Sequence, residues 1–214
     1  MKVLVAGANG QIGKQLVDKL KNSGEHTPVA LVRKQEQADS YAETGVETVL
    51  ANLEDSVDKL TEAVKGNDAI VFTAGSGGST GEDKTLLIDL DGAVKVMEAA
   101  EAAGIKRFVM VSALQANNRE NWNEKLKPYY VAKHYADRAL LQSNLTYTII
   151  RPGGLLNEPG TGKVSVGEKH DRGYIPREDV ASVILAALDE EKTYNKAFDL
   201  VSGDTPIEEA VKSV

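Results

Sequence analysis

The sequence predicts one α/β domain, in which a doubly wound parallel β-sheet carries helices on both faces. Short apolar strands alternate with amphipathic helices along the chain, and the strands lack the polar alternation of a half-exposed sheet. The length of 214 residues fits a single domain, and no repeat, low-complexity tract or linker divides residues 1–214. Ligands of such sheets bind beyond the carboxyl ends of the strands, so functional residues are expected there.

The strands are expected where apolar and β-branched residues form short runs. In chain order these runs are Val3–Ala6, Thr27–Val32, Thr48–Ala51, Ala69–Thr73, Arg107–Val111 and Thr146–Arg151. Helical patterns lie between them: residues 11–24 carry one apolar stripe and end at Gly24, and residues 85–104 end at Gly104. The polar stretches around residues 115–128 and 157–174 are expected to be long loops.

The composition excludes several classes of function. A formal net charge of -7 argues against nucleic acid or an anionic membrane as the partner, because both favour clustered Lys and Arg. The absence of cysteine excludes disulfides, thiolate metal sites and cysteine nucleophiles. The three histidines, His26, His134 and His170, are too scattered to predict a metal site.

No apolar run approaches the roughly 18 residues that a membrane-spanning helix needs, and the first residues lack the pattern of a signal peptide. We therefore expect a cytoplasmic protein that acts on a small-molecule substrate. The oligomeric state stays open, with a homodimer as the alternative to a monomer.

The first predicted strand runs into three glycines in "VLVAGANGQIG", namely Gly7, Gly10 and Gly13. Glycine permits a tight turn and lets backbone N–H groups approach a pyrophosphate at the positive end of the following helix. The spacing is G-x-x-G-x-x-G and not the dinucleotide fingerprint G-x-G-x-x-G, so an ordinary strand-to-helix turn is the alternative.

Charged and polar residues at later strand ends support a cofactor groove. Arg33 and Lys34 follow the second strand about 20 residues past the glycines, where NAD-binding enzymes usually carry a carboxylate, so they favour the 2′-phosphate of NADP over NAD. A solvated basic pair is the alternative. Asn52, in "ANLED", is placed to address an adenine edge, and "TAGSGG" after the fourth strand offers a second small-residue turn; either segment could be only a loop.

Three later residues predict proton-transfer chemistry. Ser112 follows the fifth strand, and Tyr129 and Lys133 stand four apart on one helical face in "KPYYVAKHYADRALL". A free tyrosine has a pKa of about 10, and a lysine ammonium together with an oxidised nicotinamide would favour its phenolate. The alternative is that Tyr129 and Lys133 only cover an exposed helix face.

The segments "VAGANGQIG", "VSA", "YYVAK", "RPGGL" and "IPREDVA", in this order, resemble the short-chain dehydrogenase/reductase superfamily, specifically its atypical NAD(P)-binding branch related to the NAD-dependent epimerase/dehydratase proteins. The resemblance covers essentially the whole chain. It implies a single Rossmann-type domain with a small substrate-side region at about residues 152–176. It also implies that the late helix in "IPREDVASVILAAL" is chiefly structural.

The resemblance implies a role for each matching residue. Those expected to bind the cofactor are Gly7, Asn9, Gly10, Gln11, Ile12 and Gly13 at the pyrophosphate, Arg33 and Lys34 at the 2′-phosphate, Asn52 and Leu53 at the adenine, Ala74 and Gly75 at the ribose, and Lys133, Pro152 and Gly153 at the nicotinamide end. Those expected to be catalytic are Ser112, Tyr129 and Lys133.

The chain also departs from the family. Asn52 stands where relatives commonly carry Asp, and Asp89 falls near a fourth catalytic residue that is Asn in many relatives. The chain ends about 60 residues after "RPGG", which is too soon for the substrate domain of the sugar epimerases. The pocket is therefore expected between the two polar loops, where Trp122 is either a lid contact or a surface residue.

We expect an NADP-dependent oxidoreductase that transfers hydride to or from a small carbonyl or alcohol, with Tyr129 as acid or base. One alternative is a non-catalytic NAD(P)-binding sensor or regulator of the NmrA-like kind. The other is an enzyme like the flavin and biliverdin reductases, although those relatives generally lack the tyrosine and lysine.

Overall fold

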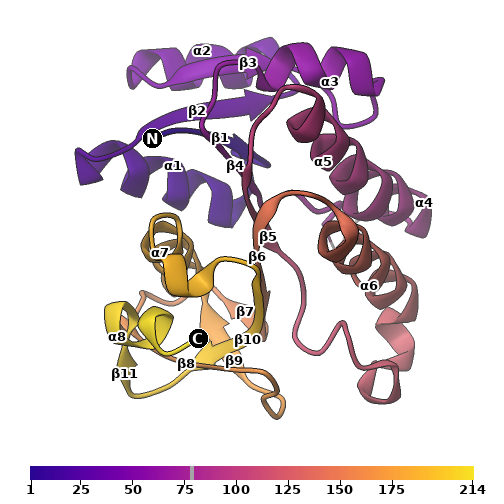
Figure 1. Cartoon of the computed structure of the whole chain (residues 1–214), viewed down its shortest axis with the longest axis vertical. Coiled ribbons are helices and arrows are strands. Elements are labelled where there is room, and N and C mark those ends of the chain that lie inside the picture. Colours follow the sequence, from indigo (N-terminus) through magenta and orange to yellow (C-terminus); the bar gives the residue numbers. More distant parts are fainter. Residues whose placement is uncertain (78–79) are drawn as a thin grey trace.

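The computed structural model describes residues 1–77 and 80–214, and a mainly parallel sheet of nine strands forms its centre (Figure 1). The strand order is β11-β8-β10-β6-β5-β4-β1-β2-β3. The parallel strands are β1 (Lys2–Ala6), β2 (Thr27–Val32), β3 (Glu47–Leu50), β4 (Ala69–Phe72), β5 (Arg107–Val111), β6 (Thr146–Pro152) and β10 (Lys196–Ser202). The predicted doubly wound fold is confirmed, and the six expected strands lie within one residue of their predicted bounds.

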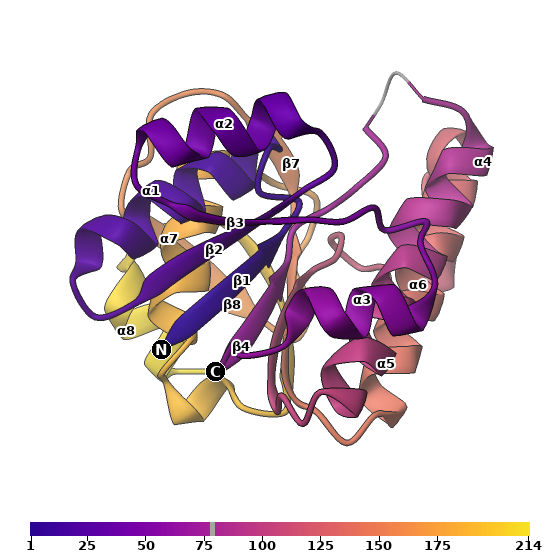
Figure 2. The ribbon, with the colours of Figure 1, turned by 90° about the horizontal axis from the view of Figure 1, so that it is seen from above.

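Helices cover both faces of the sheet, as the view from above shows (Figure 2). One face carries α1 (Gln11–Ser23), α2 (Gln35–Glu43), α7 (Arg177–Ala187) and α8 (Ile207–Lys212). The other carries α3 (Val57–Val64), α5 (Ala93–Ala102) and α6 (Lys127–Gln142). Sheets covered on both faces bury whole strands, which explains why β1 and β4 read as continuous apolar runs.

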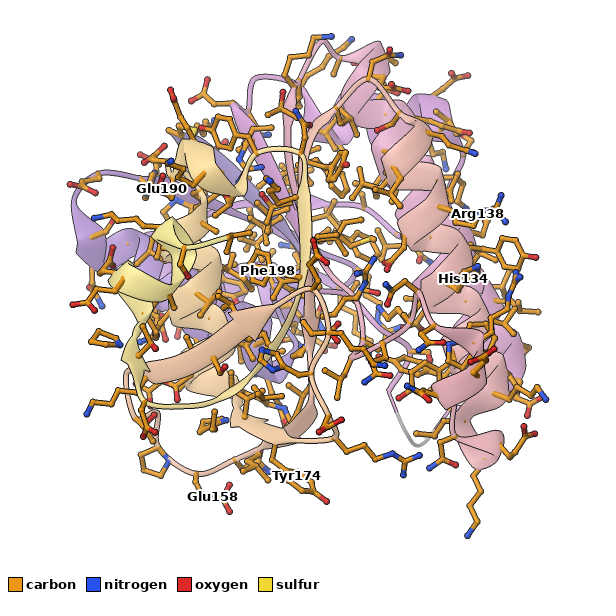
Figure 3. All side chains as sticks on the ribbon, turned by 60° about the horizontal axis from the view of Figure 1, so that its bottom comes forward. His134, Arg138, Glu158, Tyr174, Glu190 and Phe198 are labelled. Atoms are coloured by element: carbon orange, nitrogen blue, oxygen red, sulfur yellow. The ribbon has the colours of Figure 1, made fainter. Side chains whose placement is uncertain are left out.

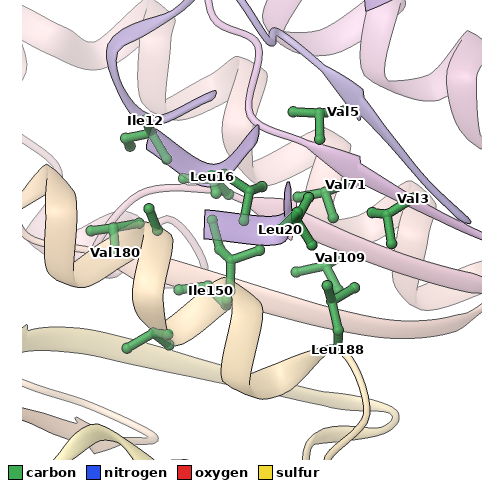
Figure 4. Packing of buried hydrophobic residues seen from close by; sticks show 14 of the residues in the cluster. Val3, Val5, Ile12, Leu16, Leu20, Val71, Val109, Ile150, Val180 and Leu188 are labelled. Carbon is green, nitrogen blue, oxygen red and sulfur yellow. The ribbon is translucent and has the colours of Figure 1, made fainter. Parts of the chain in front are cut away.

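The apolar stripe of α1 packs between the sheet and α7 (Figure 4). Leu16 and Leu20 are fully buried there, together with Val180 of α7 and Ile150 of β6. Each such side chain stabilises the fold by about 1.5–3 kcal/mol relative to an exposed position. This packing fixes the direction of α1, and therefore the position of the turn at its N-terminus.

The helix expected over residues 85–104 has an irregular start. A short helix α4 (Glu82–Lys84) leads into a π-helical segment, η1 (Thr85–Gly92), and only then into α5. π-Helical turns are frequent at functional sites because they change which side chains face inward. Here η1 turns Asp89 into the interior, where it is buried.

The C-terminal region contains strands that the sequence did not predict. β7 (Gly154–Leu156) pairs with β9 (Tyr174–Pro176), and β8 (Lys163–Gly167) runs antiparallel to β10, with β11 (Thr205–Pro206) at the edge. The prediction of a long loop over 157–174 is therefore wrong for 163–167. The loop over 115–128 holds the short 3-10 turns η2 (Arg119–Asn121) and η3 (Glu124–Leu126), and η4 (Glu191–Thr193) precedes β10.

No helix in residues 1–77 and 80–214 combines the length and the apolar character that crossing a membrane would require.

Candidate active site

The order of the strands reverses between the neighbouring strands β1 and β4. A turn follows the carboxyl end of each of these two strands, so the two turns lie side by side. The glycine turn of residues 7–13 follows β1, and residues 73–77 follow β4. Thr73 N donates to Ala6 O at 2.8 Å, which holds the two strand ends together. The crevice at such a reversal is where doubly wound sheets bind ligands. Gly78 of "TAGSGG" lies outside the described residues.

Two of the three glycines are required by packing. Gly7 has φ +91°, and a Cβ on it would lie 2.5 Å from Ala74 N. A Cβ on Gly13 would overlap the carbonyl oxygen of Gly7. These two positions therefore let the turn lie against α1 and against the start of the 73–77 segment, so Gly7, Gly13 and Ala74 form one tight layer.

Gly10 has a different environment. A Cβ there would meet only Gly7 O, at 3.2 Å, and Asn9, Gly10 and Gln11 are all exposed. Gly10 caps the N-terminus of α1 without a side-chain hydrogen bond, which leaves the first-turn amides, including that of Ile12, directed to the open side of the turn. A cradle of small residues and free amides at a helix N-terminus fits a pyrophosphate.

The turn is tied to α2 by Tyr41, which the sequence analysis missed. The Tyr41 hydroxyl donates to Ala8 O at 2.8 Å. Burial, with a contribution from Asp18, raises the pKa of Tyr41 to about 12, so the hydroxyl keeps its proton and remains a donor. No local pattern in the sequence pointed to this contact, because Ala8 and Tyr41 belong to different elements.

Arg33 and Lys34 directly follow β2, and both are exposed. β2 pairs with β1, the strand that leads into the glycine turn. Their backbone amides donate to Gln37 Oε1 at 3.2 and 3.3 Å, which fixes the start of α2. The Arg33 side chain makes no ion pair with the residues that the structure describes. The guanidinium is therefore free to contact a phosphate.

Asn52 and Leu53 follow β3 and form a closed turn. Asn52 Oδ1 accepts from Glu54 N at 3.1 Å, while Asn52 N donates to Asp55 Oδ2 at 3.0 Å. Leu53 is buried and packs against Gly92, where a Cβ would lie 3.1 Å from Leu53 Cβ. The side-chain oxygen of Asn52 is thus engaged in the turn, and the adenine contact expected of this residue stays a prediction.

The three residues expected to be catalytic come together at the end of β5. Ser112 is only 3% exposed, and Lys133, on α6, donates from Nζ to Val111 O at 3.3 Å. The same Nζ lies 5.7 Å from the centroid of the Tyr129 ring and 3.3 Å from Asp89 Oδ1. Lys133 is buried, so the alternative of an exposed helix face is wrong for this residue.

The electrostatics of Tyr129 differ from the sequence-based expectation. Burial raises the pKa of Tyr129, the Lys133 ammonium lowers it, and Asp89 raises it again, with a net rise. Burial also lowers the pKa of Lys133, but the charges of Tyr129 and Asp89 outweigh this effect and raise it. The Lys133 ammonium acts on the Tyr129 pKa in the expected direction, but burial and the Asp89 carboxylate outweigh it, and the effect expected of an oxidised nicotinamide stays a prediction.

A buried ion pair lies behind Ser112, and the sequence analysis missed it. Asp137 stands four residues after Lys133 on α6, and its Oδ2 accepts from Arg151 Nε at 2.8 Å. Burial raises the pKa of Asp137, while Arg151 and the Ser112 hydroxyl oppose the rise. Asp137 Oδ1 and Ser112 Oγ make no hydrogen bond of normal geometry to any residue that the structure describes. The spacing Tyr-x-x-x-Lys-x-x-x-Asp was the available signal.

The loop after β5 is joined to the C-terminal region through Gln115. This residue has φ 56°, an uncommon conformation for a side chain with a Cβ, and it is buried. Its amide group bonds to His170 O and to Asn121. Asp199 accepts from Gln115 N at 3.3 Å and from His170 N at 3.1 Å, which connects the two loops expected to form the pocket.

Pro152 ends β6, and Gly153 leads into the region of about residues 152–176 that is expected on the substrate side. Pro152 O accepts from Leu114 N at 2.9 Å, and Gly153 N donates to Leu200 O at 2.9 Å. A Cβ on Gly153 would overlap Gly173 O, so packing alone requires this glycine. A cavity of about 590 Å³ adjoins it, lined by Leu156, His170, Asp171, Arg172, Gly173, Tyr174, Val201 and Ser202. Tyr174 stands at its exposed rim (Figure 3).

Trp122 packs on α6. Its ring stacks on Tyr130 with centroids 5.9 Å apart and meets His134 edge-on at 5.5 Å. Trp122 Nε1 donates to Ala116 O at 3.2 Å. Of the two interpretations left open by the sequence, these contacts fit a tryptophan that packs the loop onto the helix.

Residues 7–191 match the NAD(P)H-binding family. The chain belongs to this family. The resemblance to NAD(P)-binding proteins is therefore confirmed, and the match begins at the glycine turn described above.

Three relatives have names that describe enzymes or an assembly factor. "Uncharacterized sugar epimerase YhfK" of Bacillus subtilis is 64% identical over 100% of both chains. Sanguinarine reductase of Eschscholzia californica is 27% identical and covers 99% of this chain and 93% of its own. Photosystem II assembly factor Ycf39 of Synechocystis is 29% identical and covers 94% of this chain and 62% of its own.

Solved structures share the whole fold. A protein of Bacillus halodurans, provisionally called an NAD-dependent epimerase/dehydratase, has a TM-score of 0.94 and 46% identity over 100% of both chains. The oxidoreductase ylbE of Lactococcus lactis has a TM-score of 0.91 and 34% identity, covering 100% of this chain and 96% of its own. The anaerobilin reductase ChuY of Escherichia coli has a TM-score of 0.81 and 25% identity, covering 95% and 98%.

Proposed function

We propose that the protein is an NADP-dependent oxidoreductase that acts on a small carbonyl compound or alcohol. The observation that carries the proposal is the meeting of Tyr129, Lys133 and Ser112 at the carboxyl edge of the sheet that also bears the glycine turn. This edge offers a proton donor beside the place where family members bind their nicotinamide cofactor. Two similar proteins are named as reductases, sanguinarine reductase and anaerobilin reductase, and this similarity supports a reductase activity here.

The residues present fit the cofactor. Gly10 and the free amides at the start of α1 would hold the pyrophosphate, and Arg33 would pair with a 2′-phosphate. The absence of an acidic residue at position 33 supports NADP over NAD. When bound, the reduced nicotinamide would supply a hydride to the carbonyl carbon of the substrate.

The chain's own residues would handle the substrate oxygen. The Tyr129 hydroxyl would give this oxygen its proton, and the Ser112 hydroxyl would hold it by a hydrogen bond. Lys133, fixed by Val111 O, would orient Tyr129 and contact the cofactor ribose. The cavity between β7, β9 and β10 would hold the rest of the substrate.

A calorimetric titration with NADPH and NADH, followed by a panel of aldehydes, ketones, quinones and sugars, tests the proposal. We expect tighter binding of NADPH and a fall in nicotinamide absorbance with at least one carbonyl compound. Failure of both cofactors to bind would overturn the proposal.

A second candidate is a cofactor-binding protein without turnover, and it is supported by the similarity to the assembly factor Ycf39. Tight NADPH binding without oxidation across the whole panel would favour this candidate. The pairing of the half-buried Tyr129 with the buried Lys133 supports the enzyme, because a binding protein has no need of a proton donor there.

A further inference from the structure

Asp89 is built into the interior beside Lys133. It is 1% exposed, its Oδ2 accepts from Ser76 N at 2.8 Å, and its Oδ1 lies 3.3 Å from Lys133 Nζ. The π-helical turn of η1 places this carboxylate inward, and the Ser76 amide fixes its orientation. The ammonium of Lys133 therefore lies between the Asp89 carboxylate and Val111 O.

This carboxylate changes what Lys133 does to Tyr129. An unpaired ammonium near a phenol stabilises the phenolate, but a carboxylate 3.3 Å from the ammonium offsets most of its field. The charged and titratable groups that act on Tyr129 are Lys133, Asp89, Tyr130 and Asp137. Of these, only Lys133 favours the phenolate, and burial raises the pKa of Tyr129 further.

We propose that Asp89 is a positioning residue that offsets the charge of Lys133 and keeps Tyr129 protonated, so that Tyr129 starts as a proton donor for carbonyl reduction and only its minor phenolate form can start alcohol oxidation. This inference rests on the proposed function. In reduction the O–H bond of Tyr129 breaks, the substrate oxygen gains that proton, and the phenolate then takes a proton from water. Oxidation would need the phenolate at the start, and the carboxylate disfavours it.

The test is a tyrosinate titration of the protein without cofactor. The ultraviolet difference between the wild type and Tyr129→Phe isolates the Tyr129 signal, because the other tyrosines titrate in both proteins. The same difference is then taken between Asp89→Asn and the double variant Asp89→Asn/Tyr129→Phe. We expect the Tyr129 midpoint of Asp89→Asn to fall by at least about one pH unit, the shift that one uncompensated charge at this range produces.

Asp91→Asn is the matched control. Asp91 lies two residues away on η1, is 55% exposed in its side chain, and pairs with Lys95 at 2.9 Å. Its removal should leave the Tyr129 midpoint within a few tenths of a unit, because an exposed pair is screened by solvent. An unchanged or raised midpoint in Asp89→Asn would overturn the inference, and so would an equal shift in Asp91→Asn.

A charge-neutral variant covers the case in which Asp89→Asn does not fold. Asp89→Asn/Lys133→Met removes both charges and leaves neither of them buried without its partner. If the charges of Asp89 and Lys133 cancel at Tyr129, the Tyr129 midpoint of this double variant stays within about half a pH unit of the wild-type midpoint. A midpoint raised by more than about one unit would mean that Lys133 acts on Tyr129 alone, which contradicts the inference.

The titration tests this inference and the turnover assays test the proposed function, so one can be contradicted without the other. If the protein binds NADPH and reduces a carbonyl compound, but Asp89→Asn leaves the Tyr129 midpoint unchanged, the proposed function stands and this inference is wrong. If the midpoints are as expected but the protein turns over no substrate, the proposed function is wrong. With both intact, Asp89→Asn should raise kcat for alcohol oxidation at neutral pH by about tenfold, because a midpoint lower by one unit gives about tenfold more Tyr129 phenolate.

Discussion

The hydroxyl of Tyr41 on α2 donates a hydrogen bond to the carbonyl oxygen of Ala8, 2.8 Å away in the glycine turn. The two residues are 33 positions apart, and their contact joins the second helix to the segment expected to hold the pyrophosphate. The bond therefore links the packing of α2 to the shape of the cofactor cradle.

Tyr41→Phe should weaken NADPH binding severalfold and lower the free energy of unfolding by about 0.5–1.5 kcal/mol, the usual contribution of one hydrogen bond. Calorimetry and urea unfolding measure the two effects. Tyr174→Phe, which changes an exposed tyrosine, is the control. Unchanged NADPH affinity in Tyr41→Phe would show that the turn keeps its shape without this bond.

Gly10→Val should abolish cofactor binding while the fold survives, because a side chain at Gly10 meets only Gly7 O and otherwise points to the open side of the turn. Gly13→Ala should instead destabilise the fold, since its Cβ would overlap Gly7 O. Circular dichroism and NADPH titration separate the two outcomes. Undiminished NADPH binding by Gly10→Val would make the segment an ordinary strand-to-helix turn.

Arg33→Ala should remove most of the preference for NADPH over NADH, at a cost in NADPH binding of about 1.5–3 kcal/mol for one charge-assisted contact. NADH affinity should hardly change. Arg138→Ala, an exposed arginine on α6 (Figure 3), controls for the loss of positive charge. A preference that survives in Arg33→Ala would assign the 2′-phosphate to another group.

Asp137→Asn should destabilise the fold by about 3–5 kcal/mol, because it leaves the buried Arg151 guanidinium without its charged partner. Urea unfolding at neutral pH measures this change. The double variant Asp137→Leu/Arg151→Met should recover much of the loss, since no uncompensated charge remains. A double variant less stable than the single one would contradict this account of the pair.

The parallel strands were predictable because both faces of the sheet are covered. β1, β4 and β5 are buried along nearly their whole length, so they read as unbroken apolar runs. β10 was missed because its run is interrupted by Asp199, a buried carboxylate whose partners are the backbone amides of Gln115 and His170. Local pattern gives no indication of partners that lie 84 and 29 residues away.

The candidate site was predictable where spacing alone brings residues together. Tyr129 and Lys133 are one helical turn apart, and strand-end placement put Ser112 beside them. The contacts with Asp89 and with the Asp137 and Arg151 pair depend on how α6 packs against η1 and β6, which no local pattern encodes. For the same reason the net rise of the Tyr129 pKa without cofactor could not be predicted, since burial and the Asp89 carboxylate emerge only from the packed structure.

The turnover of Tyr129→Phe with NADPH tests the central claim most directly. With a carbonyl substrate from the panel, the account predicts that kcat falls at least about a hundredfold while NADPH affinity stays nearly unchanged, because only the proton donor is lost. Because the pKa of Tyr129 is raised, wild-type reduction should hold its rate across neutral pH and lose it only in strongly alkaline solution. A Tyr129→Phe variant that reduces the substrate at the wild-type rate would contradict the account.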